Sequence, residues 1–189
     1  MKLLEDMILK EGVVLPGDIL KVGSFLNQQI DPSLLAGIGR EIARLFEDEG
    51  VTKILTIESS GIPMAAAAAM EMGVPMVFAK KHQSSNVDGD VYCVPVASYT
   101  HGMTYNVVVS MDYLRPEDKV LLVDDFLATG NALIGLIDLV GQAGAELAGA
   151  AVAIEKGYQG GGDDLRSRGI RVEALALIDS MDETGITFR

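Results

Sequence analysis

The sequence predicts an α/β fold, in which a mostly parallel sheet is flanked by helices on both faces. Short apolar runs typical of buried strands alternate along the chain with longer segments of helical period. The chain has 189 residues, 49% of them hydrophobic, so it can bury one substantial core without a metal or disulfides. We therefore expect residues 1–189 to form a single domain.

The first half of the chain is predicted from its turn residues as much as from its periodicity. Residues 1–29 indicate a short helix followed by irregular or edge structure, because Pro16 and three glycines interrupt this segment. Asp31, with Pro32 behind it, is expected to cap a helix that runs to about Asp48 with its apolar residues on one face. The next elements are a strand at 51–57, a tight turn at 58–61, an alanine-rich helix from about Pro63 to Met72 and a strand at 74–80.

The second half continues the alternation of strand and helix. Its predicted elements are β-rich segments at 91–97 and 104–114 around Ser98 to Gly102, a strand from Lys119 to Val123, a helix from Asn131 to about Gly144, a strand at 147–155, a short helix from Asp163 to Arg168 and a strand at 172–178. Because ligands bind beyond the carboxyl ends of parallel strands, we expect functional residues in the loops 58–61, 124–132 and 155–162.

Composition and charge exclude several classes of protein. The formal net charge of -12 argues against sequence-independent nucleic-acid binding, which needs a basic face. Charged residues break up the first ten positions, where a signal peptide needs an apolar core, and no run approaches the roughly 18 apolar residues of a membrane span. A single cysteine, Cys93, fits a reducing compartment. We expect a cytoplasmic protein with neither membrane nor nucleic acid as a partner.

Two adjacent acids, Asp124 and Asp125, interrupt the apolar pattern where the strand from Lys119 is expected to end. Carboxylates in partial contact with solvent at a strand end can accept hydrogen bonds from hydroxyls or approach a cation, and a neighbouring pair suits a vicinal diol. The small and polar residues 128–131 then lead into a helix, so their backbone N–H groups can surround an anion, and Gly130 can take a positive φ. The combination predicts a pocket for a ribose 5-phosphate.

Each half of this pattern also has a purely structural interpretation. An Asp-Asp pair commonly forms a solvated turn, and Thr129-Gly130 before a helix commonly forms an N-cap, but their conjunction after a buried strand favours a binding site. Two common nucleotide motifs are excluded, because the sequence has no G-x-x-x-x-G-K-[ST] and the GIGREI that starts at Gly37 lies inside a predicted helix.

The stretch VLLVDDFLATGNA, residues 120–132, resembles the phosphoribosyl pyrophosphate (PRPP) signature of type I phosphoribosyltransferases. Four further segments resemble the bacterial xanthine phosphoribosyltransferases, and the similarity runs through nearly the whole chain. These segments are EGVVLPGDILKVGSFLNQQIDP, KILTIESSGI, GVPMVFAKKH and AIEKGYQ. The resemblance implies the type I phosphoribosyltransferase fold and the transfer of phosphoribose from PRPP to xanthine, which yields xanthosine 5′-monophosphate and pyrophosphate in purine salvage. It also implies Mg²⁺ carried by PRPP and a homodimer.

Two other functions remain open at this point. A purine regulator could bind PRPP in the same pocket without catalysis, although such regulators carry a winged-helix DNA-binding domain for which residues 1–29 are too short and too weakly basic. A related phosphoribosyltransferase could prefer hypoxanthine, guanine or adenine, because the physics of the sequence does not resolve one exocyclic group.

The resemblance also implies roles for the residues that would bind PRPP. Asp124 and Asp125 would be catalytic and hold the ribose 2- and 3-hydroxyls, directly or through Mg²⁺, so no residue is predicted as a firm direct metal ligand. The pyrophosphate would meet the turn at 58–61, and Lys81 would add a positive charge, unless it is a solvated surface lysine beside Lys80. The expected PRPP-binding residues are Ala128, Thr129, Gly130, Asn131, Ala132, Ser59, Ser60, Gly61 and Lys81.

Two regions are expected to close over this pocket. Residues 1–30 would form a hood over the purine, whose expected contacts are Leu20, Asn27, Lys156 and Tyr158; each of these also has an ordinary structural explanation as a core, turn or strand-end residue. Residues 92–109 would form a flexible β-rich flap that protects a water-sensitive intermediate.

Two positions depart from related enzymes. Hypoxanthine-guanine phosphoribosyltransferases resemble the motif but carry an aspartate where this chain has Ala128, and that aspartate is thought to manage the proton on the purine. We hypothesise that the acidity of xanthine reduces the need for this base, so that catalysis rests on positioning and charge stabilisation. At the flap tip, His101 stands where a lysine often follows the Ser-Tyr-Thr sequence, which leaves the charge contribution of the tip in doubt.

Overall fold

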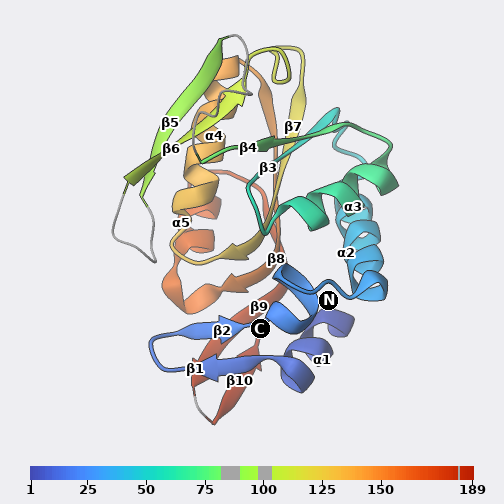
Figure 1. Ribbon diagram of the computed structural model, residues 1–189, viewed down its shortest axis with the longest axis vertical. Coiled ribbons are helices and arrows are strands. Elements are labelled where there is room, and N and C mark those ends of the chain that lie inside the picture. Colours follow the sequence, from blue (N-terminus) through green and yellow to red (C-terminus); the bar gives the residue numbers. More distant parts are fainter. Residues whose placement is uncertain (82–89, 98–103, 183) are drawn as a thin grey trace.

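In the computed structural model, residues 1–81, 90–97, 104–182 and 184–189 are described (Figure 1). The helices are α1 (Lys2–Glu11), the π-helix η1 (Gly23–Asn27), α2 (Pro32–Leu45), α3 (Ile62–Met72), α4 (Asn131–Ala143), the 3-10 helix η2 (Gly157–Gln159) and α5 (Gly161–Ser167). The strands are β1 (Val13–Leu15), β2 (Ile19–Lys21), β3 (Lys53–Ile57), β4 (Met76–Ala79), β5 (Val91–Ala97), β6 (Thr104–Ser110), β7 (Lys119–Leu127), β8 (Glu146–Lys156), β9 (Val172–Asp182) and β10 (Gly185–Phe188).

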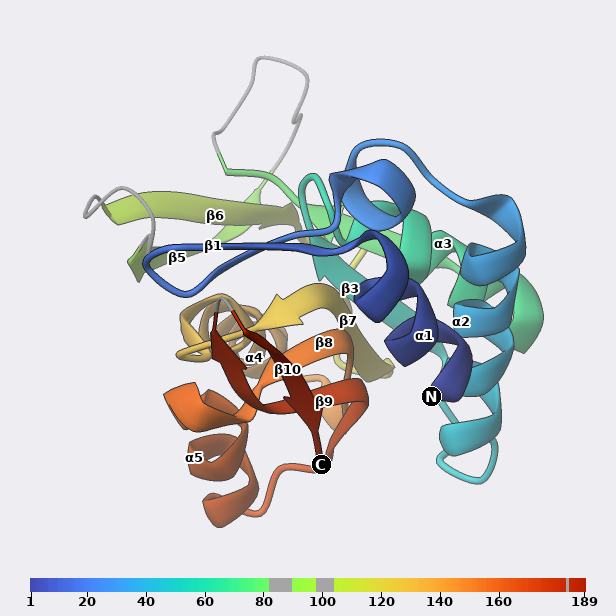
Figure 2. The same cartoon turned by 90° about the horizontal axis from the view of Figure 1, so that it is seen from below.

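The central sheet is mostly parallel, as predicted. Its strand order is β10-β9-β8-β7-β3-β4, and all neighbouring strands from β9 to β4 pair in parallel, while β10 pairs antiparallel with β9. Helices α2 and α3 cover one face, and α4 and α5 cover the other (Figures 1 and 2). Because β3, β7 and β8 are parallel neighbours, the loops that follow them emerge at the same edge of the sheet.

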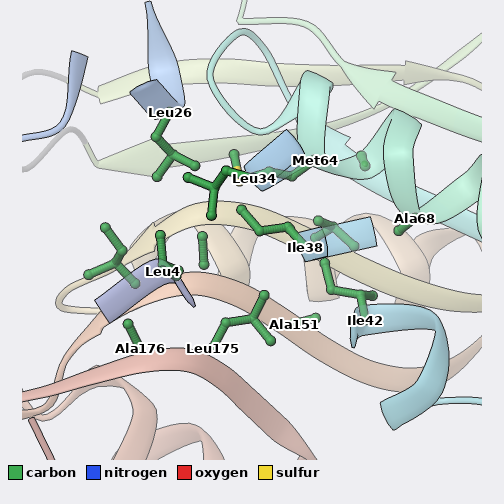
Figure 3. Close-up of a cluster of buried hydrophobic side chains, with 14 of the residues drawn as sticks. Leu4, Leu26, Leu34, Ile38, Ile42, Met64, Ala68, Ala151, Leu175 and Ala176 are labelled. Carbon is green, nitrogen blue, oxygen red and sulfur yellow. The ribbon is translucent and has the colours of Figure 1, made fainter. Parts of the chain in front are cut away.

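Alternate residues of β7 point into two separate hydrophobic clusters, one on each face of the sheet. Leu121 and Val123 belong to the cluster beneath α1, α2 and α3, whereas Val120 and Leu122 belong to the cluster beneath α4. All four side chains are fully buried. Figure 3 shows the first cluster, in which leucine and isoleucine side chains of α1 and α2 meet Met64, Ala68 and the strands β8 and β9.

The N-terminal segment has more regular structure than the sequence predicted. Strands β1 and β2 form an antiparallel hairpin, in which Leu15 pairs with Ile19 and the connecting residues Gly17 and Asp18 both have positive φ. A three-residue turn that contains a left-handed residue is a common hairpin connection, so Pro16 and Gly17 belong to the turn and do not abolish the strands. The segment is held on the sheet by six of its side chains, which are buried in the first cluster: Leu4, Ile8, Leu20, Val22, Phe25 and Leu26.

The hairpin of β5 and β6 packs on the other face of the sheet, against α4. Gly135 of α4 allows this approach, because a Cβ there would lie 2.4 Å from Cγ2 of Val96. Gln142 of α4 both accepts from the Cys93 N–H and donates to the Cys93 carbonyl, at 3.2 and 3.1 Å. The two strands of the predicted flap are thus anchored to α4, and the predicted tip, Ser98 to Gly102, lies outside the described residues.

Two strands extend further than the sequence predicted. β7 does not end at Val123, because its backbone pairing with β8 continues as far as Leu127 opposite Glu155. β9 continues to Asp182, where a turn leads into β10, a strand the sequence reading missed. The carboxylate of Asp182 accepts from the backbone N–H of Thr184 at 2.7 Å and stabilises that turn. In both places a polar residue interrupts the apolar pattern without interrupting the backbone ladder.

Candidate active site

Asp124 and Asp125 lie inside β7 and are buried, with 5% and 8% of their surface exposed. The prediction of carboxylates in partial contact with solvent was wrong, because the strand continues past them and their environment is enclosed. The backbone N–H of Asp125 donates to Oδ1 of Asp124 at 2.9 Å, and Nδ2 of Asn27 donates to Oδ2 of Asp125 at 3.1 Å. Burial, and next the charge of Asp125, raise the pKa of Asp124 well above its usual range. The pair therefore favours ligands that supply protons or positive charge.

The loop at 128–130 connects these acids to α4. Gly130 is the N-cap of α4 with a φ of 87°, and no side chain caps the helix, so the backbone N–H groups at its start face the loop without a competing side-chain acceptor. A glycine suits this left-handed position because it has no Cβ to clash with the backbone. The loop has the conformation that an anion-binding helix N-terminus requires.

Gly161, which the sequence reading did not single out, supports this loop from behind. Its N–H donates to the Ala128 carbonyl at 3.1 Å. A Cβ on Gly161 would lie 2.3 Å from that oxygen and 2.5 Å from the carbonyl carbon of Thr129, so only glycine fits without a shift of the loop. The run of three glycines at 160–162 was the available signal, but the residues that Gly161 contacts are more than thirty positions earlier in the chain.

A buried ion pair holds α5 beside the same loop. Arg166 donates to both carboxylate oxygens of Glu155, at 2.9 and 2.6 Å, and Glu155 is 1% exposed. A Cβ on Gly162 would lie only 2.0 Å from Oε1 of Glu155, which explains the second glycine of the run. A bidentate arginine-carboxylate pair fixes both partners in one geometry. The ion pair thus fixes α5, whose first residue, Gly161, contacts the loop at 128–130.

The turn at 58–61 brings its last residue against the acids. The peptide bond between Glu58 and Ser59 is cis, and Gly61 is the N-cap of α3. A Cβ on Gly61 would lie 2.2 Å from Oγ1 of Thr56 and 2.9 Å from Oδ1 of Asp124. The Thr56 hydroxyl is buried and has no hydrogen-bond partner among the described residues. Two of the three predicted loops therefore meet at Asp124.

Lys81 follows the end of β4 by two residues and is half-buried. Its backbone and its side chain contact different residues. Its N–H donates to Oε1 of Glu58 at 2.6 Å, and its Nζ lies 5.4 Å from the ring centroid of Tyr105. The charge of Lys81 acts to lower the pKa of Asp124, although burial outweighs this effect. The side chain therefore lies within electrostatic reach of the acids rather than extended into solvent.

The four predicted purine contacts occupy different environments. Leu20 is buried in the first cluster, at 7% exposure, and Asn27 reaches Asp125 from η1. Lys156, at the end of β8, donates to the Asp18 carbonyl at 2.5 Å and lies 5.8 Å from the Phe126 ring centroid. Burial lowers the pKa of Lys156. Tyr158 is exposed on η2, at 38%.

The polar contacts between residues 1–30 and the central sheet include Asn27 with Asp125, Lys156 with Asp18 and the N-terminal ammonium with the Leu175 carbonyl. His82 and His101 lie outside the described residues. Within the described ranges, no three His, Cys, Asp or Glu side chains gather as a metal site. None of the helices in those ranges is both long enough and apolar enough to cross a membrane.

Comparison with known proteins identifies the family. Residues 27–169 match the family model described as "Phosphoribosyl transferase domain". A protein of Lachnoclostridium phytofermentans named xanthine phosphoribosyltransferase is 53% identical over 96% of this chain and 94% of its own length. A protein of the same name from Bacillus cereus is 50% identical over 100% of this chain and 95% of its own.

Solved structures agree on the fold. The adenine phosphoribosyltransferase of Giardia lamblia, crystallised with 9-deazaadenine, superposes with a TM-score of 0.78 over 92% of this chain and 96% of its own, at 24% identity. The enzyme of the same name from Rhodothermus marinus gives a TM-score of 0.71 over 93% and 98%, at 25% identity. The chain belongs to the phosphoribosyltransferase family of enzymes, with the type I fold, and within that family to the xanthine phosphoribosyltransferases.

Proposed function

We propose that this enzyme transfers phosphoribose from PRPP to a ring nitrogen of xanthine and releases pyrophosphate. The observation that carries the proposal is the meeting of three features at one corner: the acids of β7, the uncapped start of α4 and the turn at 58–61, whose Gly61 is in contact range of Asp124. Acids suit the ribose hydroxyls, and backbone N–H groups suit the phosphates. The names of the relatives at 50–53% identity support xanthine as the acceptor.

In this proposal PRPP is bound along the edge of the sheet. Asp124 and Asp125 accept from the ribose hydroxyls, and residues 128–132 surround the 5-phosphate at the start of α4. Ser59, Ser60 and Gly61 donate to the pyrophosphate, and Lys81 adds positive charge. Hydroxyl donors from a bound diol would stabilise the ionised carboxylates and so oppose the burial that raises the pKa of Asp124.

Mg²⁺ carried by PRPP fits the donor set. Two neighbouring carboxylates offer oxygen ligands to a hard cation, and the absence of a third acidic ligand among the described residues suits an ion that keeps water and phosphate oxygens around it. When bound, the ion would neutralise part of the charge on the leaving pyrophosphate. Asp124 and Asp125 are the residues that would hold it near the ribose.

The hood and the end of β8 would form the purine pocket. Leu20 provides an apolar wall, Asn27 an amide that can both donate and accept, Lys156 an ammonium for a purine oxygen and Tyr158 a ring for stacking. Xanthine carries an extra carbonyl and readily loses a proton, so the ammonium favours it over other purines. The xanthine nitrogen attacks the anomeric carbon while the carbon-oxygen bond to pyrophosphate breaks, and pyrophosphate leaves with that electron pair.

In this proposal the acidity of xanthine reduces the need for a protein base, because the purine can lose its proton to water. Ala128 cannot accept a proton, and catalysis rests on positioning and on charge stabilisation of the oxocarbenium-like ribose. A steep loss of rate with pH that follows a protein group rather than xanthine would contradict this part of the proposal.

We also propose that residues 1–30 act as the hood, that residues 92–109 act as a closing flap, and that the enzyme works as a homodimer. A groove of about 790 Å³ beside β4 offers one surface for a second copy, since Phe78 and Tyr113, which line it, are 42% and 62% exposed. Sedimentation at several protein concentrations tests the dimer.

Steady-state kinetics with PRPP and Mg²⁺ tests the function. Xanthine, guanine, hypoxanthine and adenine are compared in parallel, with pyrophosphate release as the readout. We expect the highest kcat/KM with xanthine. A preference for guanine or hypoxanthine would refute the substrate, and PRPP binding without product from any purine would support a sensor instead.

A further inference from the structure

We propose that Tyr105 is a positioning residue whose ring holds the ammonium of Lys81 in place for the pyrophosphate of PRPP. The proposal rests on the proposed function, and it assigns a role in PRPP binding to the start of strand β6, where Tyr105 pairs with Val96 of β5. Nothing in the PRPP motif itself points to this residue, which lies on a different strand from the acids and from Lys81.

The backbone and the side chain of Lys81 contact different parts of the protein. Its N–H is fixed by Oε1 of Glu58 at 2.6 Å, so the start of the side chain lies beside the turn at 58–61. The four-carbon chain that follows is flexible, and its Nζ lies 5.4 Å from the Tyr105 ring centroid. This distance is within the roughly 6 Å at which an aromatic face attracts a cation.

The strands that carry the two side chains are joined directly. Lys80 and Val108 form a bridge in which each N–H donates to the other's carbonyl at 2.9 Å. Tyr105 pairs with Val96, and Val96 is buried against Gly135 of α4. The ring is therefore supported by α4 on one side and is tied to the end of β4 on the other.

The ring competes with Asp124 for the lysine. Asp124 is close enough to Lys81 for the cation to lower its pKa, and close enough to Tyr105 to raise the pKa of the phenol, after the larger effect of burial. Without the ring, the ammonium would be drawn towards the buried carboxylate and would neutralise an acid that the ribose hydroxyls require. An attraction of moderate strength to a neutral ring keeps the ammonium available for a phosphate.

The test compares two substitutions at one position. Tyr105→Leu removes the ring and keeps an apolar side chain, whereas Tyr105→Phe keeps the ring and removes only the hydroxyl. We expect Tyr105→Leu to raise the KM and Kd for PRPP about five- to tenfold and Tyr105→Phe to change them less than about twofold. Tyr92→Leu is the matched control, since Tyr92 is a tyrosine on β5 of the same hairpin, paired with Val109.

A double-mutant cycle with Lys81→Met decides whether Tyr105 acts through the lysine. We expect Tyr105→Leu to have little further effect on the Kd for PRPP once Lys81 is replaced, because the positioned cation is already gone. Additive effects, or equal losses in Tyr105→Leu and Tyr92→Leu, would overturn the proposal. Calorimetric PRPP binding without xanthine keeps the test independent of catalysis, so a failure of the proposed function appears separately, as wild-type protein that binds PRPP without turnover.

Discussion

The β7 corner and the N-terminal segment that we propose as the hood meet where Asn27 donates to Asp125, but they are built in different ways. The corner, residues 124–132 with the turn at 58–61, is formed by strand ends and glycines in direct backbone contact, such as Gly161 against Ala128. The hood, residues 1–30, is held on the sheet by buried apolar side chains, and its polar connections to the sheet include Asn27 with Asp125 and Asp18 with Lys156.

This difference in construction suggests that the corner controls the binding of PRPP and that the N-terminal segment controls the choice of purine. Backbone contacts at the corner leave no room for an added Cβ at Gly161 or Gly61, so a small intrusion there should disturb the proposed binding of PRPP. In the proposed hood, side chains would determine which purine binds. Substitutions there should therefore change the KM for the purine more than the KM for PRPP. The following predictions test this division, in order of decreasing effect.

Replacement of Asp125 by Asn should have the largest effect, because it removes a charge that we propose holds the ribose hydroxyls. We expect kcat/KM for PRPP to fall about 10²- to 10³-fold, a loss similar to that of other groups that stabilise transition-state charge. Circular dichroism and thermal unfolding should show an intact fold. A variant with wild-type PRPP kinetics would remove the diol-binding role from this residue.

Gly161→Ala should rank next, since its Cβ would lie 2.3 Å from the Ala128 carbonyl oxygen. We expect a loss of about 2 kcal/mol in the free energy of unfolding and about a tenfold rise in the KM for PRPP. Gly141→Ala in α4 is the matched control, because a Cβ there meets nothing within 4 Å. The control should leave kinetics unchanged and stabilise the helix by up to about 1 kcal/mol. If both variants behave alike, Gly161 does not support the loop.

Asn27→Ala tests the hood side of the comparison. It removes the amide that donates to Asp125 and is expected to contact xanthine. We expect the KM for xanthine to rise about tenfold and the KM for PRPP to change less than about threefold, consistent with one lost polar interaction. A larger effect on PRPP than on xanthine would show that Asn27 serves the corner instead.

Asp124→Asn should stabilise the protein while it damages activity. Because burial raises the pKa of Asp124 in the folded state, its stability contribution is complete below the unfolded-state pKa and decreases as the pH rises towards the folded-state pKa. Asparagine removes this loss, so we expect about 1 kcal/mol or more of added stability at neutral pH and a flatter pH dependence. Urea unfolding of both proteins from pH 4 to pH 8 measures this; parallel curves would argue against the raised pKa.

Lys156→Arg should have the smallest effect and should appear only at high pH. Burial lowers the pKa of Lys156, so its charge is lost at a lower pH than for an ordinary lysine, whereas arginine stays charged. We expect the decrease of kcat/KM for xanthine at alkaline pH to begin at a higher pH in the variant than in the wild type. If the alkaline decrease occurs at the same pH in both proteins, it reports the titration of the purine and not that of Lys156.

The same contrast separates what was predictable from what was not. The corner was found from sequence, because acids, small residues and glycine stand next to each other in one stretch and signal a strand-to-helix loop. The partners of the corner were not found, since the glycine run at 160–162 does not indicate which loop it contacts and nothing around Tyr105 indicates its contact with Lys81. In the hood, Pro16 and Gly17 were read as breaks in structure, although they form the turn of a hairpin whose stability comes from burial against the sheet.

By itself, the sequence determined the alternation of strands and helices, the cap of α2 at Asp31 and the left-handed Gly130 before α4. These features depend on local backbone preferences and on the period of apolar residues. Only the tertiary structure decided that Asp124 and Asp125 are buried, that Asn27 meets an acid 98 positions away and that Lys81 meets the Tyr105 ring. Such contacts depend on strand order and on the packing of helices against both faces, which bring together residues that the local sequence leaves independent.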